Sequence, residues 1–331
     1  MLVQAGLAMA ALALAYFAWQ RGPELAADEV FALDATKNDL ESVRFDDQEK
    51  STWVELGRST DETGPIVTVH LGPQAKSTAG KTPAVDEAKT PDRLVRGSEA
   101  AEKLFSSFAP LRASRSLGVL DAAKLKELGL ASTRKRLTLH LRAGQRVFTI
   151  APAPPGGSLP YLRDEASGRV YVVARSLLTD FETAASLLVE RRAHAFRLEE
   201  ADRVQISLGT LRREFLVSRS ENTVRLAPTS APDKPDLSVK TWHDRIFSLW
   251  PAEVLGRGEV PSEGAPRVEL RIDYTARGRR LGFVEIAKVA AVATTAGAKD
   301  ALFARSERTL GWFKLSADAQ NVLADTQALL R

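Results

Sequence analysis

Short runs in which apolar and polar residues alternate recur along this chain, and each run predicts a strand that buries one face. Val43 and Phe45 alternate with charged neighbours, and Leu137, Leu139 and Leu141 alternate with polar ones. In the first half of the chain, these runs predict strands at 43–45, 53–56, 66–71, 137–141, 146–150, 161–163 and 170–173. The short turns between neighbouring runs indicate antiparallel pairing.

Apolar residues at helical spacing predict helices at 98–108, 122–128 and 177–190. The third of these helices is expected to place its apolar side chains on one face, namely Leu178, Phe181, Ala185 and Leu188. Residues 72–92 are rich in Pro, Lys, Thr and Ala, a composition that indicates a long exposed loop.

The second half of the chain repeats the order of the first. The hairpin pattern Tyr161-x-Arg163 followed by 170–173 recurs as Phe303-x-Arg305 followed by 312–315. Further matches pair Phe31 and Leu33 with Phe196 and Leu198, 43–45 with 204–206, 53–56 with 215–217, and Leu137, Leu139 and Leu141 with Val268, Leu270 and Ile272. Helices are predicted at 239–249 and 317–330, and a strand at 281–286.

This repetition predicts an α+β fold of two repeated units, each an antiparallel sheet with helices on one face. The predicted units span 30–190 and 191–331, behind an N-terminal segment at 1–21. A chain of 331 residues agrees with two units, because domains average about 150 residues.

Residues 2–19 carry no charge and only one strongly polar side chain. A helix of about 18 residues spans roughly 27 Å, close to the thickness of the bilayer hydrocarbon. Tyr16, Phe17 and Trp19 lie at one end, as aromatic side chains do at the membrane surface. The segment is predicted to be a single transmembrane anchor. A cleaved signal peptide and a buried core helix are the alternatives.

The pattern of hydrophobic, aromatic and charged positions in the body is similar to that of a known bacterial family. These positions are Gly129-Leu130, Tyr161-Leu162-Arg163, Val170-Tyr171-Val172-Val173, Glu190-Arg191-Arg192, and Phe196 ahead of Val204-x-Ile206. Over residues 30–325 the chain resembles the bacterial domain of unknown function 4340 family. The resemblance implies one N-terminal membrane span, an extracytoplasmic body, and partners among ABC-type export systems related to gliding-motility transporters. It supplies no catalytic residue.

Composition narrows the remaining function classes. The chain has no cysteine, which excludes disulfides, thiolate metal sites and a cysteine nucleophile. The net charge is only +4, and the densest basic run, Arg134-Lys135-Arg136, is short, so no nucleic-acid partner is expected. The four histidines have no metal-ligand spacing, and structural roles are predicted for all of them.

The pattern Ala75-x-x-x-x-Gly80-Lys81-Thr82 fits a relaxed phosphate-binding loop. Such a loop requires a helix that starts at its Lys-Thr pair, but Pro83 follows directly and no apolar helix comes next. The pattern therefore favours an exposed Lys/Thr-rich loop over a nucleotide site.

Arg163 and Arg305 hold the same place in the two copies, where a guanidinium can bind a carboxylate or phosphate through two hydrogen bonds. The alternative is structural: each arginine covers a hairpin aromatic, Tyr161 or Phe303, or pairs with a nearby acid. These two arginines are the candidate ligand or partner contacts. No catalytic, cofactor-binding or metal-binding residue is predicted.

Together these features predict a non-enzymatic accessory protein of an ABC-type export or gliding-related complex, with permease and ATPase subunits as partners. It is expected in the bacterial inner membrane with a periplasmic body. A stand-alone cell-envelope module that binds glycan or peptide is the alternative. An enzyme or nucleotide-binding protein that uses Lys81 is a third hypothesis.

Overall fold

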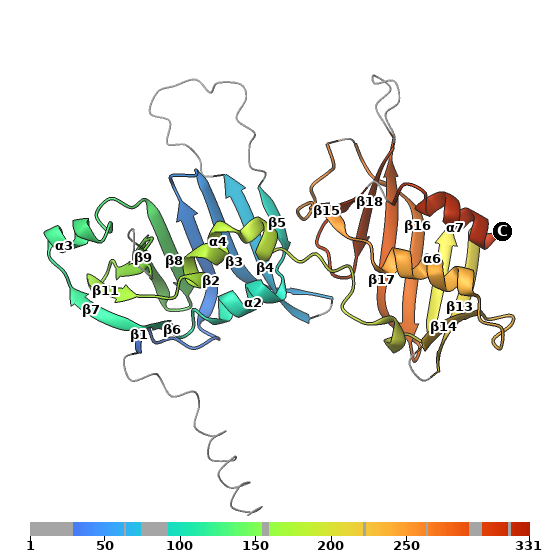
Figure 1. Cartoon of the computed structure of the whole chain (residues 1–331), viewed down its shortest axis with the longest axis horizontal. Coiled ribbons are helices and arrows are strands. Elements are labelled where there is room, and N and C mark those ends of the chain that lie inside the picture. The colour runs from blue at the N-terminus through green and yellow to red at the C-terminus, as the bar shows by residue number, and fades with distance from the viewer. Residues whose placement is uncertain are drawn as a thin grey trace, which may run out of the picture.

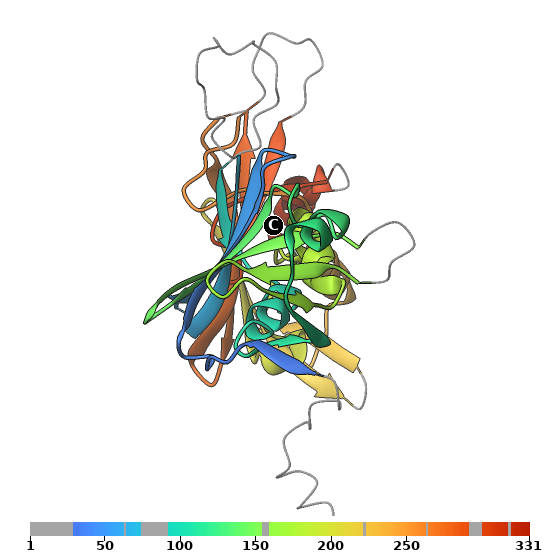
Figure 2. The ribbon, with the colours of Figure 1, turned by 90° about the vertical axis from the view of Figure 1, so that its left-hand side faces the viewer.

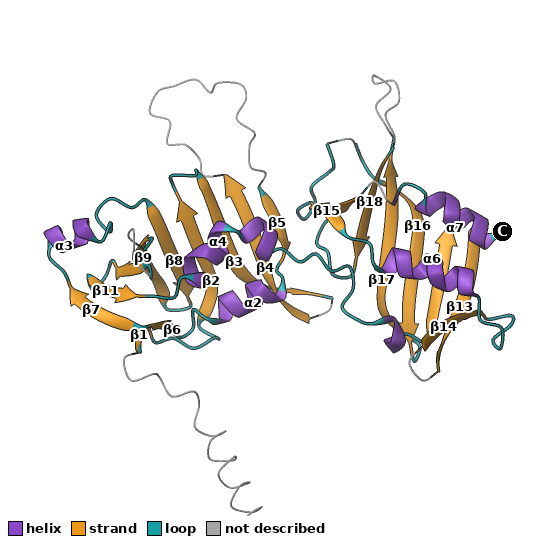
Figure 3. Ribbon diagram, in the orientation of Figure 1, coloured by secondary structure: helices purple, strands orange, loops and turns teal. Residues whose placement is uncertain are grey.

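The computed structural model describes residues 29–62, 64–73, 92–153, 159–220, 223–262, 264–290, 300–316 and 319–331. Two large twisted sheets lie side by side (Figure 1), and strands hold more of the described chain than helices do (Figure 3). The predicted combination of antiparallel sheets and helices is confirmed. No helix of these described residues is long and apolar enough to span a membrane. The predicted anchor at 2–19 and Lys81 lie outside them.

The first sheet has nine strands. Along the chain they are β2 (Leu40–Asp47), β3 (Thr52–Asp61), β4 (Gly64–Pro73), β5 (Arg93–Arg96), β7 (Arg115–Val119), β8 (Lys135–Leu141), β9 (Gly144–Ala151), β10 (Tyr161–Asp164) and β11 (Arg169–Val172). Their spatial order is β5-β4-β3-β2-β8-β9-β10-β11-β7. The accompanying elements are the strand pair β1 (Val30–Leu33) and β6 (Leu111–Ala113), and the helices α2 (Glu99–Ser106), α3 (Ala122–Glu127), α4 (Ser176–Glu182) and α5 (Ala184–Leu187).

The second sheet has eight strands. They are β12 (Arg203–Leu208), β13 (Leu211–Ser220), β14 (Thr223–Pro228), β15 (Pro251–Val254), β16 (Arg267–Ala276), β17 (Arg279–Val289), β18 (Ala301–Ser306) and β19 (Phe313–Leu315). Their spatial order is β14-β13-β12-β16-β17-β18-β19-β15. The short 3-10 helix η1 (Leu198–Glu200) precedes them, and α6 (Leu237–Phe247) and α7 (Val322–Leu330) pack on the sheet.

The two sheets have the same strand order. The order of the eight strands from β14 to β15 reproduces the order from β4 to β7, and β5 extends the first sheet at its edge. In both sheets the outermost strand, β7 or β15, comes before the next four strands along the chain and pairs with the fourth of them, β11 or β19. The main helices of both sheets lie on one side of the molecule, as Figure 2 shows. We call the opposite side of each sheet its open face; Leu130 covers part of it in the first sheet, and Leu255 covers part of it in the second.

Cross-strand pairing extends this match to single residues. Within the first sheet one row of paired residues is Phe45, Leu137, Phe148 and Asp164, and within the second it is Ile206, Ile272, Val284 and Ser306. Arg163 and Arg305 each precede the last residue of a row. They therefore occupy the same position in the two sheets, as the hairpin pattern predicts.

One predicted correspondence was wrong by four residues. In the pairing rows, the residue of the second sheet that is equivalent to Leu137 is Ile272, not Val268. Val268 is 42% exposed, whereas Leu270, Ile272 and Tyr274 are fully buried. The alternation predicted the correct face of β16, but a period of two repeats along the strand and does not by itself fix the register.

The match of Phe31 and Leu33 with Phe196 and Leu198 was also wrong. Phe31 and Leu33 belong to β1, which pairs with β6, whereas Leu198 begins η1. Phe196 instead packs its ring against Tyr274, with centroids 5.1 Å apart. Spacing alone matched these pairs, and their backbone conformations differ.

The first core forms where the helices cover β2 and β8. Phe181 of α4 stacks on Phe45 with ring centroids 5.2 Å apart, and the Phe108 ring lies 5.9 Å from the Phe181 ring. The helix predicted at 177–190 is broken at Thr183, whose φ of −110° and ψ of 18° end α4. This break turns Ala184 inward, so Ala184 is buried in place of the predicted Ala185.

The second core contains buried polar groups that are paired with one another. Trp242 of α6 donates to the Thr326 hydroxyl of α7 at 3.1 Å. The His243 ring is hydrogen bonded to the Tyr274 hydroxyl at 3.0 Å, and both side chains are fully buried. Burial lowers the pKa of His243 to about 4, so the ring is neutral at neutral pH. These contacts agree with the structural role that was predicted for this histidine.

Replacement of Phe181 by alanine is expected to lower the free energy of unfolding by about 3–5 kcal/mol, because it removes a buried ring that contacts two other aromatic rings and leaves a cavity. Chemical denaturation of the purified chain would measure the change. Leu187→Ala is the matched control, since Leu187 is exposed on the neighbouring helix and its loss is expected to cost under about 0.5 kcal/mol. Equal effects of the two substitutions would contradict the assigned core.

Candidate functional site

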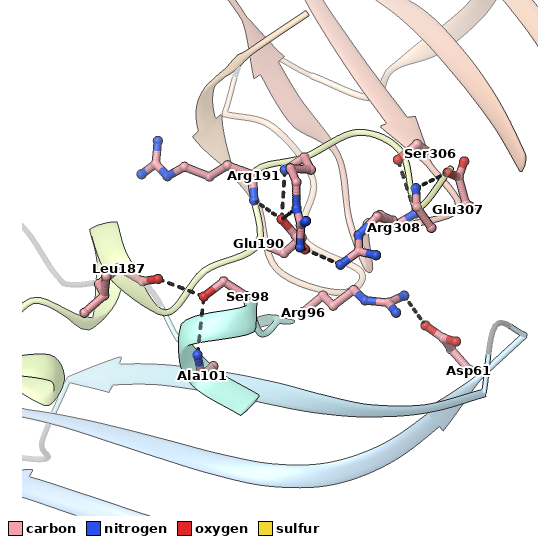
Figure 4. Close-up of polar contacts among 12 residues, drawn as sticks. Asp61, Arg96, Ser98, Ala101, Leu187, Glu190, Arg191, Ser306, Glu307 and Arg308 are labelled. Atoms are coloured by element: carbon pink, nitrogen blue, oxygen red, sulfur yellow. Dashed lines mark hydrogen bonds and ion pairs between the residues drawn. The ribbon is translucent and has the colours of Figure 1, made fainter. Parts of the chain in front are cut away.

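The candidate functional site is the junction between the two sheets, which is built around a connecting segment (residues 189–197). The segment begins as an addition to the edge of the first sheet. Val189 bridges to Gly97, and the Glu190 N–H donates to the Arg96 carbonyl at 2.9 Å. Ser98 caps α2 and also donates its hydroxyl to the Leu187 carbonyl at 2.8 Å (Figure 4). The point at which the chain leaves the first sheet is therefore fixed by backbone pairing.

A buried carboxylate lies at the centre of the junction. The Glu190 side chain is only 3% exposed, and it accepts hydrogen bonds from the backbone N–H groups of Arg191 and Arg192 at 3.0 and 2.9 Å. It also pairs with the guanidinium groups of Arg192 and Arg308 (Figure 4). Arg308 belongs to the turn after β18, so this ion pair joins the connecting segment to the second sheet.

The junction holds Glu190 in its ionised form. Burial raises the pKa of Glu190, but the hydrogen bonds from Arg192 and Arg308 lower it more, and the net pKa lies below the ordinary value. Arg96 of β5, whose carbonyl accepts from the Glu190 N–H, pairs through its side chain with Asp61 at 2.7 Å. A carboxylate fixed between two guanidiniums is suited to holding structure in place and is not a proton donor at neutral pH.

A second carboxylate, Glu307, holds the far half of the connecting segment. It is hydrogen bonded to the His194 ring at 3.2 Å and accepts from the Ala195 N–H at 3.1 Å. It also accepts from the Phe283 N–H of β17 at 3.0 Å. Gly282 makes room for this arrangement, because a Cβ there would lie 2.5 Å from the Glu307 carboxylate. The turn that carries Glu307 and Arg308 therefore contacts the connecting segment at two points, Glu190 and Ala195.

The edge strand β5 makes a third contact with the second sheet. Arg93 pairs with Glu253 at 2.7 Å and with Glu259 at 2.8 Å. The Arg257 N–H donates to the Leu94 carbonyl at 2.8 Å, so the loop after β15 adds a backbone hydrogen bond to the first sheet. Gly256 permits this approach, because a Cβ there would be 3.1 Å from the backbone of Arg93. Ion pairs and close backbone packing together hold the sheets.

The structure does not bring the two predicted site residues together. Each lies on the face of its sheet away from the main helices, because each alternates with a core residue on its strand. Beside Arg163 this face carries a small second core, in which Leu130 packs against Val170, the cross-strand partner of Arg163. Arg305 pairs with Glu285, and its guanidinium lies 4.6 Å from the centre of the Trp312 ring. Arg163 is half-buried, and its Nε has no hydrogen-bond partner among the described residues.

Sequence reasoning found part of the junction and missed the rest. The Glu190-Arg191-Arg192 run appears in the pattern that carries the family resemblance, but no role was predicted for it. Glu307 and Arg308 were missed, since charged residues in a turn are usually solvated. The one feature of the sequence that could have indicated the contact of Glu307 is Gly282 inside a predicted strand, because a glycine in a strand often marks a close approach by another group.

Comparisons of the chain with protein-family models, with curated proteins and with solved structures find no match. The functional proposal therefore rests on the geometry of the junction and on the sequence resemblance. The contacts that bear on it most directly are those of Glu190, Glu307 and Arg308.

Replacement of Glu190 by glutamine is expected to lower the free energy of unfolding by about 3 kcal/mol, because it leaves the Arg308 guanidinium without its buried partner. Glu199→Gln is the matched control, since Glu199 is exposed and η1 lies just beyond the segment. The chain has no cysteine, so spin labels at Lys124→Cys and Asp233→Cys would report one distance between the sheets. That distance is expected to broaden in Glu190→Gln, and an unchanged distribution would refute the role of Glu190.

The stability difference between the native chain and Glu190→Gln is expected to depend on pH. The folded pKa of Glu190 is depressed, so its contribution is complete above the unfolded pKa and is lost as the pH falls through the folded pKa. The difference should be constant near neutral pH and should shrink below about pH 4.3. Denaturation series at several pH values measure it. A difference that grows on acidification would contradict the assigned ion pairs.

Proposed function

We propose that the protein is a non-enzymatic accessory subunit of an ABC-type export or gliding-related membrane complex. Residues 2–19 would anchor it in the inner membrane, and the two sheets would form a periplasmic body. The resemblance to the domain of unknown function 4340 family supplies the class of partner. The geometry supplies the manner of action, in which two modules of the same topology present fixed surfaces.

The observation that carries the proposal is the use of buried charge at the junction. Glu190, Glu307 and Arg308 are all engaged in holding the connecting segment. An ionised carboxylate that is removed from water stabilises a structure only when its partners are in place, so these contacts favour one arrangement of the modules over others. A fixed arrangement suits a subunit that must match the spacing of sites on a partner assembly.

The open faces offer matched partner contacts. Arg163 and Arg305 lie at the same position of the two sheets, so a partner with repeated or symmetric features would meet the same residue type twice. On the second sheet, Arg305 is backed by Glu285, which also pairs with Arg271. These ion pairs hold the Arg305 guanidinium in place and reduce the conformational entropy that it loses when a partner binds.

We place the glycan- or peptide-binding alternative second. The aromatic side chain that favours it is Trp53, which lies on the open face of the first sheet. Its ring already contacts the Arg44 guanidinium at 4.4 Å and the His70 ring at 4.5 Å. It also lies against Gly72, where a Cβ would be 2.4 Å from ring atoms. These contacts occupy ring surface on which a sugar would stack.

Purification of the tagged full chain from membranes in mild detergent, followed by mass spectrometry, is expected to recover an ABC permease and its ATPase in fixed ratio. Glu190→Gln is expected to reduce that recovery, since it loosens the arrangement of the modules. Arg163→Ala combined with Arg305→Ala is expected to reduce it while the chain stays folded, because Arg271 still pairs with Glu285. Arg225→Ala is the control, because Arg225 is exposed on the edge strand β14.

Recovery of the chain without transporter subunits would refute the proposal. Recovery together with a bound glycan or peptide would favour the independent envelope module. Equal recovery of the transporter with all the variants would retain the accessory role and reject the open-face arginines as contacts.

A further inference from the structure

An open pocket at one end of the second sheet lies outside the junction. It forms where η1 and the start of β12 meet the end of β13 and the β16–β17 hairpin. Its volume is about 730 Å³, within the roughly 300–1,000 Å³ that small-molecule sites occupy. Its charged lining residues are Glu200, Asp202, Arg219, Arg277, Arg279 and Arg280.

The two acids of the pocket are already engaged by backbone groups. Asp202 accepts from the Arg277 N–H at 2.6 Å, and Glu200 accepts from the Arg197 N–H at 2.9 Å. The guanidiniums of Arg219, Arg277 and Arg279 form no ion pair with any described residue. With four arginines and two acids among its lining residues, the pocket carries a net positive formal charge.

The fourth arginine is held in position on one side of the pocket. The Arg280 guanidinium lies 4.5 Å from the centre of the Phe283 ring, and its Nε is 3.7 Å from the Asp273 carboxylate. A guanidinium stacked on an aromatic ring keeps its outer N–H donors available, and these donors fit the oxygens of phosphate.

The backbone of the hairpin adds an independent observation. Arg277 and Gly278 are the two central residues of the turn, with φ of 51° and 74°. A turn that requires positive φ at both positions favours Asn, Asp or Gly at the first. An arginine there costs backbone strain, and strained residues concentrate where a side chain serves a ligand. The hydrogen bond from the Arg277 N–H to Asp202 holds this conformation.

The corresponding hairpin of the first sheet lacks this feature. Its central residues are Arg142 and Ala143, neither of which has positive φ. The strained arginine is thus a property of the second sheet and is not required by the shared topology.

We propose that this pocket binds a phosphate-bearing anion, with Arg219, Arg277 and Arg279 as the principal ligands and Arg280 as a fixed fourth donor. Several guanidiniums around one open pocket suit a group with two or more negative charges. A soluble phosphate compound and a phospholipid headgroup share this chemistry. The site goes beyond the proposed accessory function and does not depend on it.

Calorimetric titration of the detergent-solubilised full chain with inorganic pyrophosphate tests the site. Saturable binding is expected for the native chain, and Arg277→Asn combined with Arg279→Gln is expected to weaken it at least tenfold. Asparagine tolerates positive φ, so Arg277→Asn removes the guanidinium while relieving strain, and its thermal midpoint should match or exceed that of the native chain. Arg225→Gln, which removes one exposed arginine from the adjacent strand β14, is the control and should bind as the native chain does.

The lipid arm uses short-chain phosphatidic acid and phosphatidylcholine below their micelle concentrations. Displacement of pyrophosphate by phosphatidic acid but not by phosphatidylcholine would identify a phospholipid headgroup as the natural ligand. Pyrophosphate binding without displacement would identify a soluble phosphate compound. Absence of saturable binding, or equal weakening in Arg225→Gln and in the pocket variant, would overturn the proposal.

Discussion

The arrangement of this molecule depends on one buried carboxylate, that of Glu190. It lies on the segment between the two sheets and is paired with Arg192 of the same segment and Arg308 of the second sheet. Without these partners the removal of the carboxylate from water would be strongly unfavourable, so the pairing and the position of the sheets are coupled. Two further contacts hold the sheets together: Glu307 binds the connecting segment at Ala195, and Arg93 of β5 pairs with Glu259.

The two sheets share strand order and register, yet equivalent loops make different contacts. In the first sheet the turn after β10 folds back on itself: Asp164 accepts from the Ser167 hydroxyl and from the Ala166 N–H. In the second, the equivalent turn after β18 holds the connecting segment through Glu307 and Arg308. The hairpin that carries Arg277 is likewise specific to the second sheet. A shared framework thus supports the two modules, and their loops give each module its own contacts.

Much of the framework could be read from the chain. Alternation predicted the strands, the hairpin pattern predicted that Arg163 and Arg305 are equivalent, and pairing rows across four strands agree with it. Four details were wrong: the register of Val268, the match of 53–56 with 215–217, the match of Phe31 with Phe196, and the continuity of the helix beyond Thr183. In the second of these, the pairing rows place Phe215 at the position of Leu56. Each of them depends on neighbours that are distant in sequence, and a local period cannot specify such neighbours.

The sequence by itself determined the antiparallel sheets, their helices and the repeated hairpin, because apolar periodicity and turn residues act over a few neighbouring positions. Only the tertiary structure decided the junction and the arginine pocket. The Glu190 and Arg308 side chains are 118 positions apart, and Arg219 of β13 and Arg277 of the β16–β17 turn line one pocket. Charged residues in turns read as solvated, and their burial depends on which segments the fold brings against them. Folding in three dimensions therefore turned ordinary turn charges into the features that hold the sheets together and line the pocket.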